Sequence, residues 1–299
     1  MTAGTTPIRR PRELSQRTSK RPKLSLTRLL LYVVVVSLSI VFMFPFLWTL
    51  VSSLKSPLEL TRWPPTIIPQ EIVWDNYPAV FREGPFGRFI WNTIVITVTA
   101  TFGQVVSSII VAYGFARLRF PGRGALFGLC LSTMILPAQV TIVPLFLLFR
   151  QLQWIDTYLP LIVPYYTGTA FTVFLLRQFI LTLPYDLDEA ATIDGASRLG
   201  ILWKIIVPNC GSAIATVSVF AFMGHWNAFL EPFIFLNTPI KFPLGVGLRF
   251  LTSIIQSPGL PKDNLLMAGS VMMTAPIVVL FFLAQEYVVQ GIATTGLKG

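Results

Sequence analysis

Residues 184–208 read PYDLDEAATIDGASRLGILWKIIVP, a polar stretch of helical pattern between two strongly apolar segments. Its first turn carries the carboxylates of Asp186, Asp188 and Glu189. Carboxylates at this place oppose the positive end of a helix dipole, and Asp186 with Glu189 has the spacing of a capping pair. The pattern therefore predicts a helix that begins near Asp186.

The second half of this stretch predicts a turn and another short helix. Ala190 and Ala191 favour helix, and their small side chains let the groove of a partner approach the backbone of this loop closely. Gly195 permits a turn that a residue with a Cβ atom would resist. Ser197 is placed to cap the second helix, and Pro208 cannot continue a helical hydrogen-bond ladder, so the next element is expected to start afresh there. An amphipathic connector lying on a bilayer surface is the alternative interpretation.

Composition indicates a membrane protein. Of the 299 residues, 54% are hydrophobic and 12% are charged, with a mean hydropathy of +0.68, far from the balance of a soluble domain. A span of hydrocarbon about 30 Å thick needs roughly 20 helical residues. Six stretches meet this length, and the fold class predicted is an all-α polytopic membrane protein with six transmembrane helices at 29–51, 90–116, 125–149, 159–180, 209–236 and 265–286. The fifth is interrupted by Gly224–Asn227 and is expected to bend or end early.

Basic residues predict the orientation, since Lys and Arg are retained on the cytoplasmic side of short loops. Fifteen of the 23 lie in the tail up to Arg28 or in segments on the same side as that tail. Both termini and the 184–208 loop are therefore predicted to be cytoplasmic. The domain prediction is a disordered basic tail at 1–28, a six-helix membrane domain at 29–286 and a cytoplasmic tail at 287–299. The net charge of +10 follows from this asymmetry and favours anionic membrane lipid over nucleic acid.

Two loops on the other side, 52–88 and 237–264, are rich in proline. Such loops suit compact caps near the membrane interface. Both are expected to face an external partner.

Several chemistries are disfavoured by the residue inventory. His225 is the only histidine, which provides neither a paired haem ligand nor the two-histidine spacing of a zinc protease. It is expected to satisfy a local polar contact. Cys130 and Cys210 are isolated thiols that are expected to pack in apolar surroundings. No catalytic, metal or cofactor site is predicted in this chain, and no G-x-x-x-x-G-K-[ST] loop is present, so any ATP must be bound by another chain.

Charge within the apolar segments is scarce, and Glu231 is the exception. An ionisable group at this depth marks a solute pathway by default, with a solvated interfacial carboxylate as the alternative. Polar and amphipathic groups that could bond to or stack on a polyhydroxyl solute complete the candidate pathway, which consists of Gln104, Gln139, Trp226, Asn227 and Glu231.

Sequence strings along most of the chain carry a family resemblance. They are ILPAQVTIVPLF from Ile135, DTYLPLIVP from Asp156, FLLRQFI from Phe174, EAATIDGAS from Glu189 and WNAFLEPFIFL from Trp226. Together they resemble the smaller six-helix permease of carbohydrate ABC importers of the maltose or glycerol-phosphate type. The 184–208 stretch resembles the cytoplasmic coupling loop of that family, with Val207 where a leucine is usual. Glu231 also departs, since a bulky apolar or aromatic residue is expected there.

The resemblance implies an ABC type I importer permease fold in a cell membrane. It implies a second permease subunit in a heterodimer, two ATP-binding subunits that hold ATP and Mg, an extracytoplasmic solute-binding protein and a sugar-like substrate. The loop would dock on one ATPase through Asp188, Glu189, Ala190, Ala191, Asp194, Gly195, Ala196, Ser197 and Pro208.

Two other functions remain open from the sequence. The first is an ABC importer permease for a non-sugar solute such as an amino acid, a polyamine or phosphate. The second, from a different class, is a stand-alone secondary carrier or channel, which should show inverted repeats or buried ionisable residues. An intramembrane enzyme is disfavoured because His225 has no nucleophile or metal partner at a motif spacing.

Overall fold

The computed structural model describes residues 26–255 and 262–296, and within these ranges the chain is helical and has no strand. The prediction of an all-α chain is confirmed. The helices are α1 (Leu26–Ser52), α2 (Pro57–Leu60), α3 (Asn76–Glu83), α4 (Phe86–Arg117), α5 (Arg123–Ser132), α6 (Ala138–Gln151), α7 (Leu159–Ile162), α8 (Ala170–Ile180), α9 (Asp186–Ile193), α10 (Arg198–Ile201), α11 (Val207–Asn209), α12 (Gly211–Trp226), α13 (Leu230–Phe235), α14 (Leu244–Ile255) and α15 (Asp263–Gly296). Shorter turns are η1 (Thr133–Ile135), η2 (Val163–Thr167), the π-helical η3 (Leu202–Ile206) and η4 (Pro239–Lys241).

The chain forms two compact units, which divide within α1 between Leu47 and Trp48. The predicted tail at 1–28 lies outside the described residues as far as residue 25. At the other end, α15 continues past residue 286, where the last predicted span ends, and reaches Gly296.

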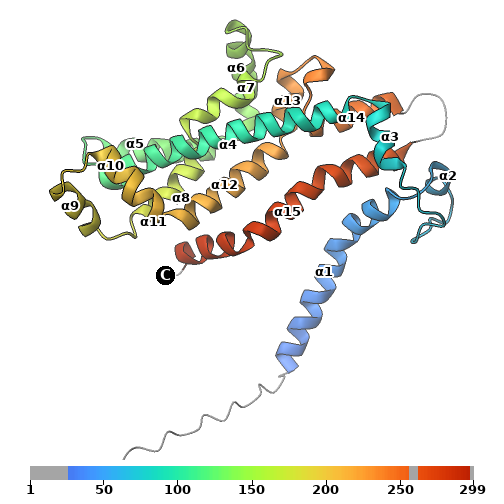
Figure 1. Cartoon of the computed structure of the whole chain (residues 1–299), viewed down its shortest axis with the longest axis horizontal. Helices are drawn as coiled ribbons and strands as arrows, with labels where there is room; N and C mark the ends of the chain where they lie inside the picture. The colour runs from blue at the N-terminus through green and yellow to red at the C-terminus, as the bar shows by residue number, and fades with distance from the viewer. Residues whose placement is uncertain (1–25, 256–261, 297–299) are drawn as a thin grey trace, which may run out of the picture. The chain divides into compact units, whose positions relative to one another are not determined.

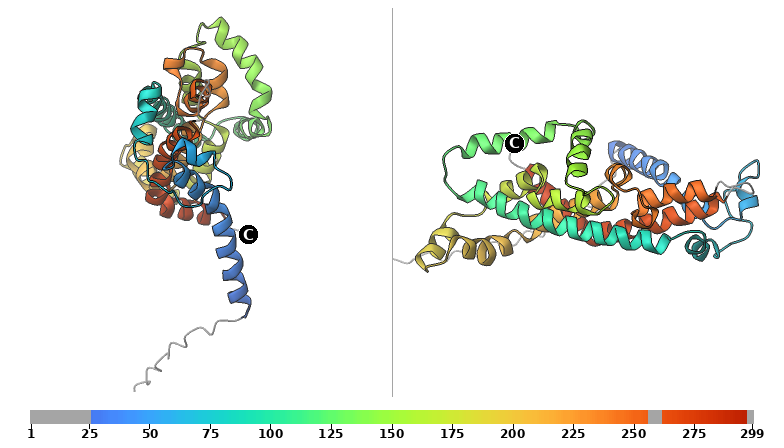
Figure 2. Two further views of the ribbon diagram at one scale, coloured as in Figure 1. Left: turned by 90° about the vertical axis from the view of Figure 1, so that its right-hand side faces the viewer. Right: turned by 90° about the horizontal axis from the view of Figure 1, so that it is seen from above.

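Four helical stretches are each long and apolar enough to cross a membrane: Leu26–Ser52, Phe86–Arg117, Leu159–Ile180 and Asp263–Glu286. Two further candidate spans are bent pairs of helices. One, at the predicted span 125–149, has a 100° bend between Arg123–Ile135 and Ala138–Gln151, visible from two further directions in Figure 2. The other has an 83° bend between Arg198–Asn209 and Gly211–Trp226, so nearly all of its first arm lies in the 184–208 loop, before the predicted span at 209–236. The described chain therefore has up to six spans when each bent pair counts as one.

The bends have local causes. Pro137 precedes α6 in an extended conformation, and proline cannot donate the hydrogen bond that would continue α5 and η1. At the second bend a short new element, α11, begins at Val207 with Pro208 in its first turn, close to the fresh start that the sequence predicts. The π-helical turn η3 directly precedes it, and the direction changes only around Cys210. As predicted, α12 ends early, at Trp226.

A bundle of α4, α8, α12 and α15 forms the body of the unit that begins at Trp48 (Figure 1). Helix α4 packs against both α8 and α12, and α15 packs on α12. One apolar core joins Ala112 and Ala116 of α4 with Leu176 of α8 and Val217 of α12. The same core includes residues of α9, α10 and η3, so the 184–208 loop is packed onto the bundle.

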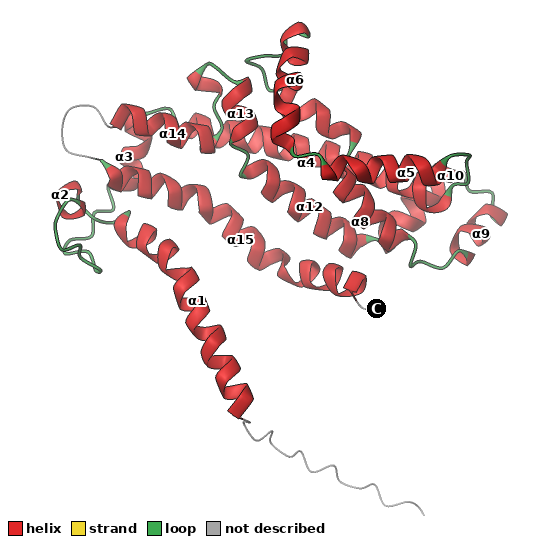
Figure 3. Cartoon of the chain, turned by 180° about the vertical axis from the view of Figure 1, so that it is seen from behind, coloured by secondary structure: helices red, strands yellow, loops and turns green. Residues whose placement is uncertain are grey.

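The two ends of this bundle carry different elements. Helices α9 and α10 lie at one end, and α3 and α14 lie at the other, which Figure 3 shows from behind. At the α3 end, the buried Asn76 donates to the carbonyl oxygens of Ser53 and Lys55 at 2.8 and 2.9 Å. Asn264 of α15 donates to the Asn76 side-chain oxygen at 2.7 Å. These bonds fix the start of α3 against the start of α15.

Candidate functional site

Helix α9 begins at Asp186, as the sequence predicts, but its first amide groups are not capped by the side chains that the sequence suggests. Tyr185 is its N-cap, and no side chain caps the helix. The expected capping pair of Asp186 and Glu189 is therefore wrong. The amide groups of Asp188 and Glu189 instead donate to the carbonyl oxygen of Tyr185 at 2.9 and 3.2 Å. The three carboxylates of the first turn still lie at the positive end of the helix dipole.

The turn after α9 requires the glycine that the sequence singles out. Gly195 has a φ of +79°, in the left-handed region. Its amide donates to the carbonyl of Thr192 at 3.1 Å, and the amide of Ala196 donates to that of Ala191 at 2.9 Å. These two bonds make the Schellman motif that ends many helices. The second helix, α10, is capped as predicted, because the Gly200 amide donates to the Ser197 hydroxyl at 3.1 Å.

The loop has an exposed face and a buried face. Most of the predicted docking residues are exposed: Glu189, Ala190, Asp194, Gly195, Ser197 and Pro208. Ala191 is only 7% exposed and packs in the apolar core, so of the two alanines Ala190 alone lies on the low outer surface. Sequence reasoning missed Ile193 and Leu199, whose side chains are 86% and 63% exposed. The signal present in the sequence is a large apolar residue within an otherwise polar loop, and their exposure in the structure makes them candidates for a contact with a partner.

Asp188 belongs to a different contact, which ties the loop to the end of α4. Its Oδ2 lies 3.3 Å from the Nε of Arg117, and the two side chains are 14% and 1% exposed. The Arg117 guanidinium stacks over the Tyr185 ring, 4.1 Å from its centroid, and donates to the carbonyl of Leu183 at 2.8 Å. Tyr185 in turn donates its hydroxyl to the carbonyl of Ala116 at 3.1 Å. We call Arg117, Tyr185 and Asp188 the Arg117 clamp.

The ion pair in the Arg117 clamp positions α9 more than it stabilises the fold. Burial raises the pKa of the Asp188 carboxyl above its ordinary value, although the Arg117 guanidinium opposes that shift. Desolvation therefore outweighs attraction for this carboxylate, as is common for buried ion pairs. The pair holds α9 in one place relative to α4 and adds little net stability.

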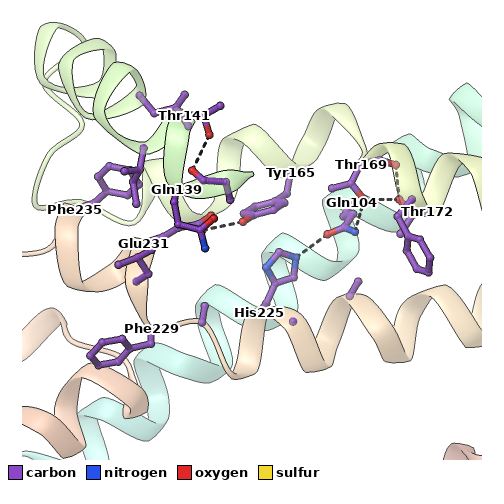
Figure 4. Close-up of a pocket in the computed structure, with 18 of the residues that line it drawn as sticks. Gln104, Gln139, Thr141, Tyr165, Thr169, Thr172, His225, Phe229, Glu231 and Phe235 are labelled. Atoms are coloured by element: carbon purple, nitrogen blue, oxygen red, sulfur yellow. Dashed lines mark hydrogen bonds between the residues drawn. The ribbon is translucent and has the colours of Figure 1, made fainter. Parts of the chain in front are cut away.

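A cavity of about 450 Å³ lies between α4, α6, α8, α12 and α13 (Figure 4). It forms where helices are interrupted: at the start of α6 after Pro137, at Thr169 before α8 and around Ala228 between α12 and α13. Interrupted helices within membrane spans are tolerated where they line such a cavity, because polar groups there can find partners.

One wall of the cavity is a chain of polar side chains. The His225 Nε2 donates to the Gln104 Oε1 at 2.8 Å, and the Gln104 amide donates to the Thr169 hydroxyl at 3.0 Å. Thr169 and Thr172 hydroxyls lie 2.9 Å apart. The contact of His225 confirms the expectation that this histidine satisfies a local polar partner.

Tyr165 links this polar wall to the acidic residue. Its hydroxyl donates to the Oε2 of the half-buried Glu231 at 2.8 Å, and its ring meets that of His225 edge to face, with centroids 4.3 Å apart (Figure 4). The lining also includes the aromatic rings of Phe171, Phe220, Phe229 and Phe235. The cavity thus combines hydroxyl and amide groups with apolar ring faces.

The structure brings together three of the five candidate pathway residues: Gln104, Gln139 and Glu231. Trp226 lies elsewhere. It is buried in another core, where its indole N–H donates to the Met273 carbonyl at 3.0 Å. Asn227 is exposed, donates to the carbonyl of Met223 at 2.9 Å and does not line the cavity.

Sequence reasoning missed Tyr165, Thr169 and Thr172 and did not assign His225 to the pathway. A signal was present in the string VPYYTGTA from Val163. A proline and a glycine within one apolar segment mark an interrupted helix. Gly168 indeed has a φ of +75° there.

Known proteins are similar to this chain along most of its length. The family model described as "Binding-protein-dependent transport system inner membrane component" matches residues 104–294. The arabinooligosaccharides transport system permease protein AraQ of Bacillus subtilis (strain 168) is 32% identical over 93% of this chain and 98% of its own. The sulfoquinovosyl glycerol transport system permease protein SmoH of Agrobacterium fabrum is 32% identical over 86% of this chain and 89% of its own.

The sn-glycerol-3-phosphate transport system permease protein UgpE of Yersinia enterocolitica is 31% identical over 84% of this chain and 90% of its own. A chain in the crystal structure of a bacterial ABC transporter involved in the import of the acidic polysaccharide alginate has a TM-score of 0.77. The identity is 23%, over 89% of this chain and 99% of that one. This likeness supports the same fold.

Proposed function

Because this chain belongs to the family of inner-membrane components of binding-protein-dependent transport systems, we propose that it carries a sugar or sugar-like solute as the permease subunit of an ATP-driven importer. The names of its relatives refer to arabinooligosaccharides, sulfoquinovosyl glycerol and glycerol 3-phosphate, all rich in hydroxyl groups. The polar and aromatic walls of the cavity suit such solutes.

The partners proposed are a second permease subunit, two ATP-binding subunits that hold ATP and Mg, and an extracytoplasmic solute-binding protein. The exposed face of the 184–208 loop is the proposed ATPase contact, with Ala190 allowing close approach and Ile193 and Leu199 as apolar anchors. The loop, both termini and the basic tail at 1–28 would then be cytoplasmic, as would the segment 287–299. The elements around α3 and α14 would face the binding protein.

The observation that carries the proposal is the rigid link between the loop and the bundle. Helix α9 ends in a Schellman motif at Gly195 and is held to α4 by the Arg117 clamp. When nucleotide closes the ATPase subunits, α9 would move as a rigid body and tilt the bundle between inward-open and outward-open states. ATP and the solute-loaded binding protein can drive this change only because they bind the outward-open state more tightly than the inward-open one. Hydrolysis resets the cycle.

The first experiment is an affinity purification of the chain, tagged at Gly299, from its native membrane in mild detergent. Co-purifying chains are identified by mass spectrometry. We expect an ATPase with a phosphate-binding loop and a second multi-helix permease. Recovery of the chain alone and intact would contradict the importer and favour a stand-alone carrier.

The second experiment tests the docking face with a matched pair of variants. Ala190→Asp places a carboxylate and extra volume on the exposed surface, whereas Ala190→Ser stays small and uncharged. In proteoliposomes containing the complete transporter, Ala190→Asp should insert but lose most ATP-coupled uptake, while Ala190→Ser should keep it. Normal uptake by Ala190→Asp would count against docking at this face.

A further inference from the structure

We propose that Glu231 makes the cavity selective for uncharged polyhydroxyl solutes and excludes anionic ones, an inference that rests on the proposed function. The cavity of about 450 Å³ is lined by one carboxylate, that of Glu231, and no Lys or Arg is among its described lining residues. A permease that transports a solute with a phosphate or sulfonate group would need basic side chains in its cavity in place of this carboxylate. Charge, rather than cavity size, is the feature by which this chain would discriminate.

Arg249 is not among the residues that line this cavity. It lines a second hollow of about 690 Å³, where its guanidinium lies over the Phe233 ring, 5.3 Å from the centroid. Glu231 receives its hydrogen bond from the neutral hydroxyl of Tyr165. Glu231 is half-buried in a cavity that is partly lined by aromatic rings, so its negative charge is screened less than in bulk water and repels a second anion that enters.

The hydrogen-bonding capacity of the site suits hydroxyl groups. Tyr165 donates to the Oε2 of Glu231, and no donor among the described residues lies on Oε1, which can accept from a solute hydroxyl. The exposed Gln139 offers both a donor and an acceptor. Phe229 and Phe235 provide flat faces on which the C–H face of a sugar ring can pack.

A cationic solute fits this cavity less well than a neutral one. An ammonium group would pair directly with Glu231 in poorly hydrated surroundings and would leave slowly. A transport pathway must bind its solute weakly enough to release it. Hydrogen bonds to neutral hydroxyls meet that condition.

The test measures the electrostatic potential of the cavity and needs no known solute. Ala138 lines the cavity and is exposed, so Ala138→Cys places a reporter thiol there. Cys130 and Cys210 are first replaced by alanine. The complete transporter in proteoliposomes is treated with a cationic and an anionic methanethiosulfonate reagent, and the two rates are divided by those of a free thiol. We expect the cationic reagent to react at least about tenfold faster, because the local potential concentrates cations.

Two further variants make this result decisive. Glu231→Gln should bring the rate ratio close to that of the free thiol, whereas Glu286→Gln, at an exposed acid on α15 that does not line the cavity, should leave it unchanged. An unchanged ratio in Glu231→Gln would overturn the proposal. Because the measurement does not depend on ATP coupling, it can fail while the importer function stands, and the reverse is also true.

A binding assay tests the solute class. The solute-binding protein proposed as a partner is purified and screened by thermal shift against arabinotriose, xylotriose, glycerol 3-phosphate, trigalacturonate and glucosamine. The proposal requires the largest shift with a neutral sugar, and wild-type uptake of that sugar should exceed uptake of its uronic acid analogue by at least about tenfold. Preference for an anionic or amino compound in either assay would overturn it.

Discussion

Arg117 shows how much one side chain can organise at the end of a helix. Its guanidinium pairs with Asp188, stacks on Tyr185 and donates to the carbonyl of Leu183. These partners follow Arg117 in the sequence by more than sixty residues, so no local pattern predicts them. Gly195 and Ser197 were predictable because a turn and a cap depend on neighbouring residues alone.

The first prediction concerns the shape of this side chain. Arg117→Lys keeps the charge but loses the planar group that stacks on Tyr185 and reaches two acceptors at once. We expect an assembled transporter whose solute uptake per ATP hydrolysed falls by about tenfold, measured in proteoliposomes; a tenfold ratio corresponds to about 1.4 kcal/mol. Arg119→Lys, at an exposed position two residues on, is the matched control and should change nothing. Equal coupling in both variants would show that the Arg117 clamp does not transmit movement.

The second prediction concerns Asp156, whose carboxylate organises the loop after α13. It accepts from the amides of Asn237 and Thr238 at 2.9 Å each, and from the Thr238 hydroxyl and the Lys241 ammonium at 2.6 and 2.8 Å. Burial raises the pKa of Asp156, but these hydrogen bonds outweigh it and hold the pKa well below its ordinary value. A depressed folded-state pKa contributes stability above the unfolded value, near 3.9, that is lost only as the pH falls below it.

The amides of this loop should therefore stay protected from hydrogen exchange from pH 7 down to about 4, and the loop should lose stability in stronger acid. Asp156→Asn should loosen it at every pH, because asparagine has one accepting oxygen in place of two, so either the two backbone amides or the Thr238 hydroxyl and Lys241 lose their acceptor. The cost is expected near the lower end of the roughly 1.5–3 kcal/mol typical of hydrogen bonds to charged groups, since the Lys241 and Asp156 side chains are 38% and 25% exposed. Hydrogen exchange at the Asn237 and Thr238 amides measures this loss of stability. Unchanged protection from exchange in Asp156→Asn would contradict the role assigned to the carboxylate.

Trp226 illustrates what residue type alone does not settle. The string around it suggested a pathway, yet the side chain points into an apolar core and bonds to Met273. Neighbouring positions on a helix face different directions, and which direction meets the cavity depends on tertiary packing. His225, one position earlier, is the residue that lines it.

At the scale of elements, the close approach of α4 to η2 depends on a missing side chain. A Cβ atom on Gly103 would lie 2.2 Å from ring atoms of Tyr166, whereas a Cβ atom on Gly114 of the same helix would meet nothing within 4 Å. The two glycines therefore form a matched pair within one helix.

Gly103→Ala should destabilise the protein by about 1–3 kcal/mol through overpacking, partly offset by a gain of roughly 1 kcal/mol in helix propensity. Gly114→Ala gains the propensity without the clash. Thermal unfolding in detergent should thus give a lower Tm for the first variant and an equal or higher Tm for the second. A Tm for Gly103→Ala at or above that of Gly114→Ala would show that Tyr166 moves aside freely.

The bends mark the limit of sequence reasoning about elements. Hydropathy reports the length and apolar content of a segment, but not its direction, so 125–149 was predicted as one span although Pro137 divides it by a 100° bend. Near the second bend, the π-helical turn at Leu202–Ile206 packs in the apolar core and has no distinctive sequence pattern.

At the scale of the whole molecule, resemblance spread along the chain predicted the family correctly, and charge distribution predicts an orientation that stays a prediction. Single cysteines can test it after Cys130 and Cys210 are replaced. In intact cells, an impermeant thiol reagent should label Trp63→Cys, at a side chain that is 88% exposed, and should not reach Asp194→Cys, which is exposed on the loop at 184–208. Labelling of Asp194→Cys from outside would invert the proposed topology.

Helix α4 runs from Phe86 to Arg117 without a proline in its interior. Gln104 in the cavity and Arg117 at the loop are thirteen residues apart on it, which corresponds to roughly 20 Å of helix at 1.5 Å per residue. The solute would thus contact α4 at one point, and the ATPase would act on the same helix at another point, through the loop. Because α4 would move as one rigid body, a tilt imposed at the loop reaches the cavity directly. The timing of solute release then need not depend on a series of small side-chain rearrangements.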